Sequence, residues 1–163
     1  MRKIKFTSKT FIYALIILLA FFMGQLIKYI FCPFIVSGNS MFPTYKDRQL
    51  VFGSRNYEYS ELTPGVIVCF KYKSSESAHT ITLIKRIVAK ENDTIYIKDG
   101  ILYVNDKESP YQFEAITNAG ILSEPYTVPH GYVFCMGDNR NHSSDCRDFG
   151  AISFSEIIAI IQK

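Results

Sequence analysis

The sequence predicts a mostly β body preceded by a single membrane-spanning helix. One uncharged apolar run lies near the N-terminus. The rest of the 163-residue chain is divided into short runs rich in Val, Ile, Phe and Tyr that are separated by turn residues. Apart from the N-terminal run, no segment shows the long amphipathic period of a surface helix. The length fits one domain of ordinary size besides that run.

The uncharged run extends from Phe11 to Ile27, and Gln25 is its one strongly polar side chain. About twenty apolar residues cross a bilayer core as a helix. A cleaved signal peptide is the alternative, but its apolar region is shorter and small residues follow it. Bulky residues follow here, at 28–32. We therefore expect an uncleaved transmembrane anchor at residues 11–31, with the lipid bilayer as a partner.

The first ten residues carry four basic side chains and no acid, so the formal net charge of +3 leaves −1 for the remainder. Basic flanks of a membrane helix stay in the cytoplasm. We expect a cytoplasmic tail at 1–10 and an extracytoplasmic body at 32–163, in a single-pass protein of the cell membrane. Nucleic-acid binders spread basic residues over a folded face, so the near-neutral body argues against a nucleic-acid partner.

The body contains eight candidate strands. Asp99-Gly100 between two alternating runs is a strong hairpin signal, because glycine takes the positive φ that such turns require. Residues 106–130 contain three prolines and scattered polar residues, so we expect a small inserted excursion off the main sheet. The expected strands are Phe34–Ser37, Gln49–Gly53, Val66–Tyr72, Thr80–Lys90, Thr94–Lys98, Ile101–Asn105, Tyr132–Met136 and Ile157–Gln162.

Four cysteines are too few for a disulfide scaffold in a chain of this length. The sequence does not decide whether Cys135 and Cys146 pair. A zinc site formed by these two residues and His142 would lack a close ligand pair such as C-x-x-C. With no nucleotide motif visible, we expect no metal and no cofactor.

Ser40 follows the anchor closely, in the segment VSGNSMFPTY at 36–45. Turn serines beside Gly and Asn are common. The segment is not a G-x-S-x-G elbow, because Phe42 stands where the last glycine would be. Taken alone, Ser40 is a weak candidate for a nucleophile.

Lys85 lies inside an apolar candidate strand. Because side chains alternate along a strand, it shares its face with Ile81, Leu83, Ile87 and Ala89. Desolvation lowers the pKa of an ammonium group. A neutral amine can then accept a proton from a serine hydroxyl, as in known Ser–Lys variants of the catalytic triad. A lysine that snorkels from an edge strand to water is the alternative.

The third segment, MGDNRNHSSDCRDFG at 136–150, is dense in charged and polar residues directly after an apolar strand. Such a loop can form a charge-paired network that holds a site rigid. A solvated turn is the alternative.

Together these segments resemble bacterial type I signal peptidases, the Ser–Lys dyad enzymes of peptidase family S26. The family's motifs occur in its order: G-x-S-M-x-P-T at 38–44, G-D-I-V-x-F at 65–70, K-R-V-I-G-x-x-G-D at 85–93, and a long box at 128–150. The resemblance covers essentially the whole chain. It implies a signal-peptidase-type antiparallel β-sheet catalytic domain.

The resemblance also implies residue roles. Ser40 would attack the scissile carbonyl, its backbone N–H would contribute to the oxyanion hole, and Lys85 would be the general base. Eukaryotic relatives carry histidine in place of this lysine, so Lys85 favours the prokaryotic class, and His79, His130 and His142 are expected to be ordinary surface residues. The implied supporting groups are Ser143, bonded to the lysine amine, and the ion pairs Asp145–Arg147 and Asp138–Arg86.

The chain departs from the family motifs at five positions. Gly38 stands where some members carry a serine hydroxyl for the oxyanion hole. Val66 replaces an Asp, Ala89 and Asn92 replace glycines, and Cys146 replaces a serine. None of these positions belongs to the dyad, so we expect their effects in loop geometry and catalytic efficiency.

The implied activity is that of a membrane-bound serine endopeptidase. It would remove N-terminal signal peptides from secretory preproteins, cutting after small residues at −1 and −3. An extended peptide adds to an exposed sheet edge as a strand, and alternate side chains enter pockets. The candidate pocket residues are Phe34, Val36, Met41, Tyr45, Leu83 and Ile84.

Two alternatives compete with this function. Self-cleaving repressors use a related Ser–Lys fold, but they are soluble and need a DNA-binding or partner segment where this chain has its anchor. A signal-peptidase-like assembly factor, for instance in pilus biogenesis, can lose its dyad, whereas Ser40 and Lys85 are both present here. An intact dyad is also compatible with a peptidase dedicated to a narrow substrate such as a pilin.

Overall fold

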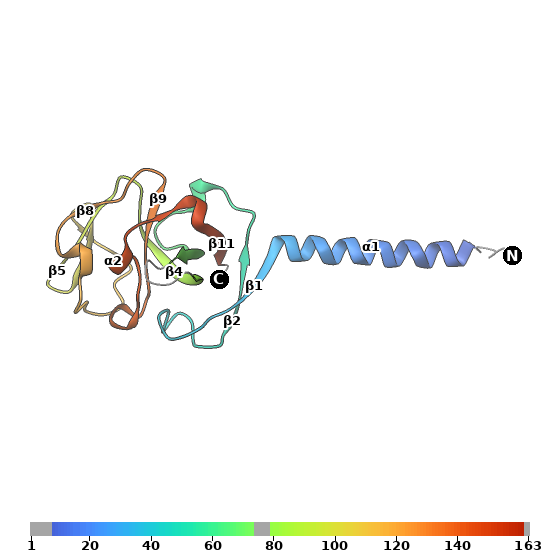
Figure 1. The fold of residues 1–163 in the computed structure, drawn as a ribbon, viewed down its shortest axis with the longest axis horizontal. Coiled ribbons are helices and arrows are strands. Elements are labelled where there is room, and N and C mark those ends of the chain that lie inside the picture. Colours follow the sequence, from blue (N-terminus) through green and yellow to red (C-terminus); the bar gives the residue numbers. More distant parts are fainter. Residues whose placement is uncertain (1–7, 74–78, 162–163) are drawn as a thin grey trace.

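A computed structural model describes residues 8–73 and 79–161 of the chain. A long N-terminal helix projects from a body made of two β-sheets, and the body follows the C-terminal end of the helix (Figure 1). Every recorded strand pairing in both sheets is antiparallel. The predicted fold class, mostly β after one apolar helix, is confirmed.

The helix α1 (Ser8–Ile30) contains an apolar span from Lys9 to Ile27 with a mean hydropathy of 2.3 and no part buried in the body. Its length and composition suit a membrane crossing. The first strand begins at Phe31, so the last residue of the predicted anchor belongs to the sheet. Three of the four basic residues of the predicted tail lie in 1–7, outside the described residues.

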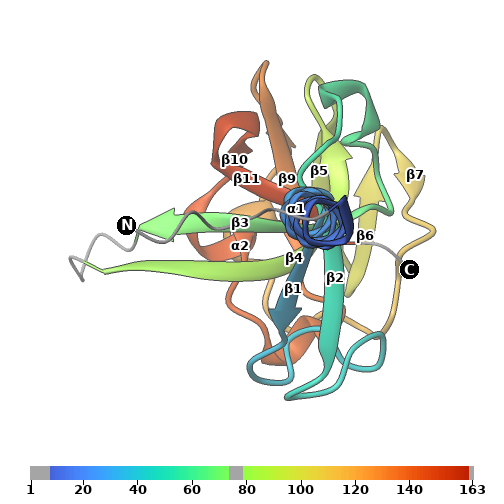
Figure 2. The same ribbon diagram turned by 90° about the vertical axis from the view of Figure 1, so that its right-hand side faces the viewer.

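The main sheet has seven strands in the order β1-β2-β11-β3-β4-β9-β10. Its β3–β4 hairpin projects sideways from the body when the molecule is viewed along α1 (Figure 2). The strands are β1 (Phe31–Ile35), β2 (Leu50–Ser54), β3 (Ile67–Lys73), β4 (Thr80–Lys90), β9 (Tyr132–Met136), β10 (Ile152–Ser153) and β11 (Ile157–Ile161).

The smaller sheet has four strands in the order β7-β6-β5-β8. Asp99 and Gly100 form the turn between β5 and β6 with φ of 51° and 77°, which confirms the predicted hairpin. The region 106–130 contributes two of the four strands and a short 3₁₀ turn, Gly120–Ser123. The strands are β5 (Thr94–Lys98), β6 (Ile101–Val104), β7 (Lys107–Glu108) and β8 (Tyr126–Thr127).

Three predicted strands, now β4, β5 and β9, have the expected bounds. The first strand was misplaced at Phe34–Ser37, because β1 starts to pair with β2 at Phe31, immediately after the helix. The two-residue strands β7, β8 and β10 were not predicted, since so short a run has no readable alternation. The end of the last predicted strand, Gln162, lies outside the described residues.

The body has two hydrophobic clusters. The larger one contains residues of both sheets, including Phe70, Ile87 and Leu102. The smaller one lies on the other side of β3 and β4 and contains Met41 and Cys69. The outer half of β4 alternates between them, since Leu83 packs against the first cluster and Ile84 against the second.

Candidate active site

Ser40 lies on the loop that follows β1, where the chain turns back toward β2. The turn is closed by main-chain bonds from Phe42 N to Asn39 O and from Tyr45 N to Met41 O. Met41 is fully buried in the smaller cluster, so the residue after Ser40 fixes the loop to the core. Ser40 itself is only partly buried.

The Ser40 loop is bonded to the loop after β9, about a hundred residues along the chain. Asn139 N donates to Ser40 O at 3.1 Å, and Asn139 Nδ2 donates to Asn39 O at 3.0 Å. Thr44 Oγ1 donates to Asp138 Oδ2 at 2.5 Å. Thr44 and Asn139 were not among the predicted site residues, because these bonds follow from the meeting of distant loops and leave no local sequence signal.

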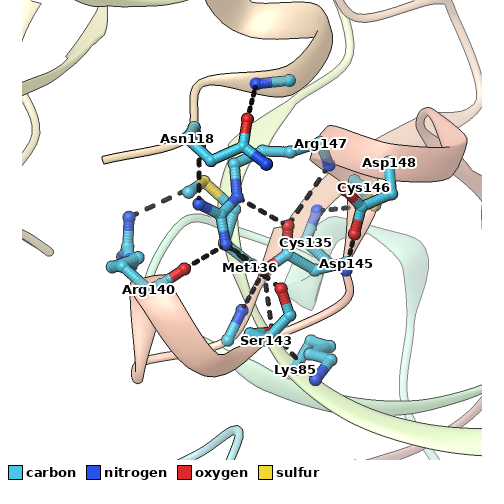
Figure 3. A network of polar contacts seen from close by, with 12 residues as sticks. Lys85, Asn118, Cys135, Met136, Arg140, Ser143, Asp145, Cys146, Arg147 and Asp148 are labelled. Carbon is cyan, nitrogen blue, oxygen red and sulfur yellow. Dashed lines mark hydrogen bonds and ion pairs between the residues drawn. The ribbon is translucent and has the colours of Figure 1, made fainter. Parts of the chain in front are cut away.

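Lys85 lies on β4 with 2% of its surface exposed, and Figure 3 shows it beside Ser143. Its Nζ donates to Ser143 Oγ at 3.1 Å. Burial lowers the pKa of Lys85, and the carboxylate of Asp145 opposes that shift. Desolvation is the larger effect, so the site favours the neutral amine relative to a lysine in water.

Ser143 is oriented by Asp145, a carboxylate with no exposed surface. Ser143 Oγ donates to Asp145 Oδ2 at 2.8 Å. Since a hydroxyl has a single proton, Ser143 receives the bond from Lys85 on a lone pair. Gly137 N also donates to Asp145 Oδ2, at 2.9 Å, and Arg147 Nε donates to Oδ1 at 2.9 Å. The Asp145–Arg147 pair that the family resemblance implied is therefore formed.

Arg86 and Asp138 form the other implied pair, a buried bidentate contact with Nε–Oδ1 and Nη2–Oδ2 distances of 2.8 and 2.7 Å. The hydrogen bonds to Asp138 raise the pKa of Arg86. Arg86 is next to Lys85 on β4, and Asp138 also accepts from Thr44. The pair thereby joins β4 to the loop after β9 and to the Ser40 loop.

Part of the irregular region, residues 111–118, lies against the loop after β9. Arg140, which is 1% exposed, donates from Nη2 to Tyr111 O at 2.5 Å. Arg147, on the short helix α2 (Cys146–Phe149) that follows this loop, donates from Nη1 to Asn118 O at 3.0 Å, as Figure 3 shows. Burial lowers the pKa of Arg140 to about 10. Arg140 was not among the predicted site residues either, because nothing in the sequence of a polar loop indicates which arginine is buried.

Gly137 lies where the nucleophile loop and the Lys85–Ser143 pair meet. A Cβ at this position would lie 2.5 Å from Ser40 O and 2.2 Å from Ser143 Oγ. Within the described residues, no hydrogen bond joins Ser40 Oγ directly to Lys85 Nζ. Catalytic hydrogen bonds are often long in unliganded enzymes and shorten when substrate binds.

Ser40 lines a cavity of about 840 Å³. Five of the six candidate pocket residues line it too, whereas Tyr45 is buried in the smaller cluster. Two strand edges near it are unpaired in the described sheet: the outer edge of β1, and residues 80–85 of β4, since β9 pairs only with Arg86–Lys90. The five pocket residues are Phe34, Val36, Met41, Leu83 and Ile84.

All four cysteines are buried, and no disulfide is formed among the described residues. Cys135 and Cys146 are close to each other, with Cys135 N donating to Cys146 Sγ at 3.2 Å, but they form no disulfide. The described residues contain no cluster of three His, Cys, Asp or Glu side chains that could hold a metal ion. The side chains of His79, His130 and His142 are exposed.

Comparison with known proteins matches residues 8–162 to the family model described as signal peptidase, peptidase S26. The chain belongs to this family. Signal peptidase I T of Bacillus subtilis (strain 168) is 34% identical, over 87% of this chain and 78% of that protein. Signal peptidase I of Bacillus amyloliquefaciens is 32% identical over the same shares of the two chains. A solved signal peptidase I from Enterococcus faecalis V583 has a TM-score of 0.47 and 23% identity, over 61% of this chain and 96% of that one.

Proposed function

We propose that this protein is a membrane-anchored serine endopeptidase that removes N-terminal signal peptides from secretory preproteins. Ser40 is the nucleophile and Lys85 the general base. The observation that carries these roles is a buried lysine amine, oriented by Ser143, beside the loop that holds Ser40 at a cavity. Family membership and relatives named signal peptidase I favour this function over that of a signal-peptidase-like assembly factor.

In the proposed mechanism, Ser40 Oγ attacks the scissile carbonyl carbon while Lys85 Nζ accepts the hydroxyl proton. The new ammonium is stabilised through Ser143 by the Asp145 carboxylate. It then donates its proton to the departing amine, which leaves an acyl-enzyme on Ser40. The neutral lysine next takes a proton from water as the water oxygen attacks the acyl carbon, and the ammonium returns this proton to Ser40 Oγ as the carboxylic acid product leaves.

The oxyanion that forms during attack is stabilised by the backbone N–H of Ser40. A second donor from residue 38 is missing, because glycine has no side chain. Gly38 has a φ of +83°, and a Cβ there would meet nothing within 4 Å. A side chain at this position would therefore have room but a strained backbone, and the hole of this chain relies on main-chain donors or water.

The preprotein binds as an extended strand along the unpaired edges of β1 and β4. Main-chain bonds hold the peptide, and alternate side chains enter the cavity. The walls near Ser40 are apolar, which suits small uncharged residues at −1 and −3. Tyr45 shapes this region from the core beneath it, through its packing with Met41 and Val36.

The anchor places the catalytic body at the outer membrane surface. The tail at 1–10 is cytoplasmic, the helix crosses the cell membrane, and residues 32–163 form the extracytoplasmic domain, with residues 106–130 as its inserted segment. The tail's basic residues support this orientation. No nucleic acid takes part in the activity.

The test is incubation of the detergent-solubilised protein with a preprotein, followed by sequencing of the new N-terminus. We expect one cut after small residues at −1 and −3, and none with the Ser40→Ala variant. Cleavage by Ser40→Ala at the parent's rate would refute the nucleophile assignment. A folded parent that cuts no preprotein would refute the function.

A further inference from the structure

The Ser40 cavity changes in character away from the nucleophile. Val36 and Met41, in the segment of Ser40, line it with apolar side chains, whereas Arg55 and Lys71 line it with basic ones. Neither has an ion-pair partner within 4 Å among the described residues. The carboxylate of Glu156 also lines the cavity, but its Oε2 already accepts a bond from Ser153 N at 3.0 Å.

The positions of the two basic residues follow from strand register. Lys71 on β3 is opposite Thr82 on β4. Thr82 lies on the same face of β4 as the pocket residue Ile84 and is two residues before it, a rise of about 7 Å along the strand. Arg55 follows Ser54, which pairs with Phe31, the first residue after the membrane helix. Arg55 is thus at the end of the cavity nearest the helix.

The same geometry gives the direction of a bound substrate. A signal peptide whose apolar segment crosses the membrane in the orientation of α1 leaves the bilayer where α1 ends. Its last residues then run toward Ser40 in the same direction as β1. Residues upstream of −3 therefore pass Arg55 and Lys71 before the scissile bond reaches Ser40.

Resting on the proposed function, we propose that Arg55 and Lys71 form a cationic subsite for an acidic side chain of the preprotein, located between its apolar segment and position −3. A carboxylate there would be an ion-pair partner that neither side chain has among the described residues. A basic residue at the same place would be repelled. The subsite adds a charge preference to the selection of small residues at −1 and −3.

The experiment uses the full-length protein in an uncharged detergent at low ionic strength. Substrates share a cleavable segment and differ only in a glutamate moved through positions −4 to −7, each with a glutamine partner. We expect the glutamate substrate to have a kcat/KM roughly two- to tenfold higher at one or two positions. The ratio should fall toward about one in roughly 0.5 M salt, because salt screens exposed charges.

The variant Arg55→Gln/Lys71→Gln should remove this preference while still cutting the glutamine substrates. Arg48→Gln and Lys73→Gln are matched controls, because both residues are exposed basic side chains outside the cavity. Both control variants should keep the preference for glutamate. An equal glutamate preference in the double variant, or none in the parent, would overturn the subsite. The subsite would also be overturned if the double variant changed only the stimulation of cleavage by anionic lipid vesicles. The two side chains would then face lipid and not the preprotein. A folded parent that cuts neither the glutamate nor the glutamine substrates would instead refute the proposed function, and the subsite with it.

Discussion

At the scale of single residues, the fold makes Lys85 less basic by burying it. Because its folded pKa is lowered, the folded protein binds fewer protons than the unfolded chain in the pH range between the lowered pKa and about 10.4. The stability lost by burying the amine is therefore greatest at low pH and is recovered as pH rises through that range.

This linkage predicts the behaviour of Lys85→Met, which has a similar length and no charge. At neutral pH we expect the variant to be inactive and more stable than the parent, with the stability difference shrinking as the pH approaches about 10. Urea unfolding of both proteins over a series of pH values measures it. A difference independent of pH would mean that Lys85 keeps an ordinary pKa in the folded state.

Asn139 is predicted to position Ser40 through its bond to Asn39 O. In Asn139→Ala we expect kcat to fall roughly tenfold or more with little change in KM, since small displacements of reacting groups are costly. Asn139→Asp has no side-chain N–H to donate, so its kcat should fall as much as that of Asn139→Ala. Asn56→Ala is the control, because the recorded bonds of Asn56 involve only its main chain. If Asn139→Asp had the kcat and KM of the parent, the Asn139 side chain would not position Ser40.

Alternation along the strand marked Lys85 as a candidate but left a lysine that snorkels to water open, and the structure buries the side chain. The detail was incomplete, since Ile81 is 46% exposed and contributes little to burying the amine. The bonds of Thr44, Asn139 and Arg140 could not be predicted in this way. They depend on how two loops and an irregular segment meet in space, which no local period encodes.

At the scale of elements, the site depends on close contact between the Ser40 loop and the loop after β9. Gly137 permits that contact, because its missing side chain leaves room for Ser40 O and Ser143 Oγ. Most of the longer strands were predictable because they have a readable hydrophobic pattern, whereas β1 was misplaced. The contact between the loops was not, since a glycine before an aspartate is ordinary in any turn.

Gly137→Ala is therefore expected to separate the two loops. Overpacking of this kind costs about 1–3 kcal/mol of stability, and we expect kcat/KM to fall about 100-fold or more. Gly131→Ala is the matched control. Its Cβ would meet nothing within 4 Å, although its φ of +80° carries a backbone cost of its own. Thermal unfolding and peptide cleavage measure both variants, and equal activity of the two would refute the packing argument.

At the scale of the whole molecule, one helix and one catalytic body are joined without a spacer, since β1 begins at the residue after α1. The cavity therefore begins close to the point where the chain leaves the membrane. This arrangement suits a substrate that is itself anchored in the bilayer, because the enzyme and the scissile bond are held at the same height.

The orientation can be tested with an epitope placed after Lys163. In intact protoplasts we expect added protease to digest the epitope, because the proposed orientation keeps the basic N-terminal tail in the cytoplasm. Permeabilised cells serve as the control for accessibility. Full protection of the epitope in intact protoplasts, with digestion after permeabilisation, would place the catalytic body on the wrong side of the membrane.

The central claim is that a neutral Lys85 activates Ser40, and the pH dependence of kcat/KM tests it most directly. Activity of the parent should rise with pH through a pKa well below the value of about 10.4 for a free lysine. Lys85→Arg should fall to the background of Ser40→Ala across the whole range, because a guanidinium stays protonated and cannot accept the serine proton. A Lys85→Arg variant that processes preprotein with the parent's rate and pH profile, while Ser40 remains essential, would contradict the account.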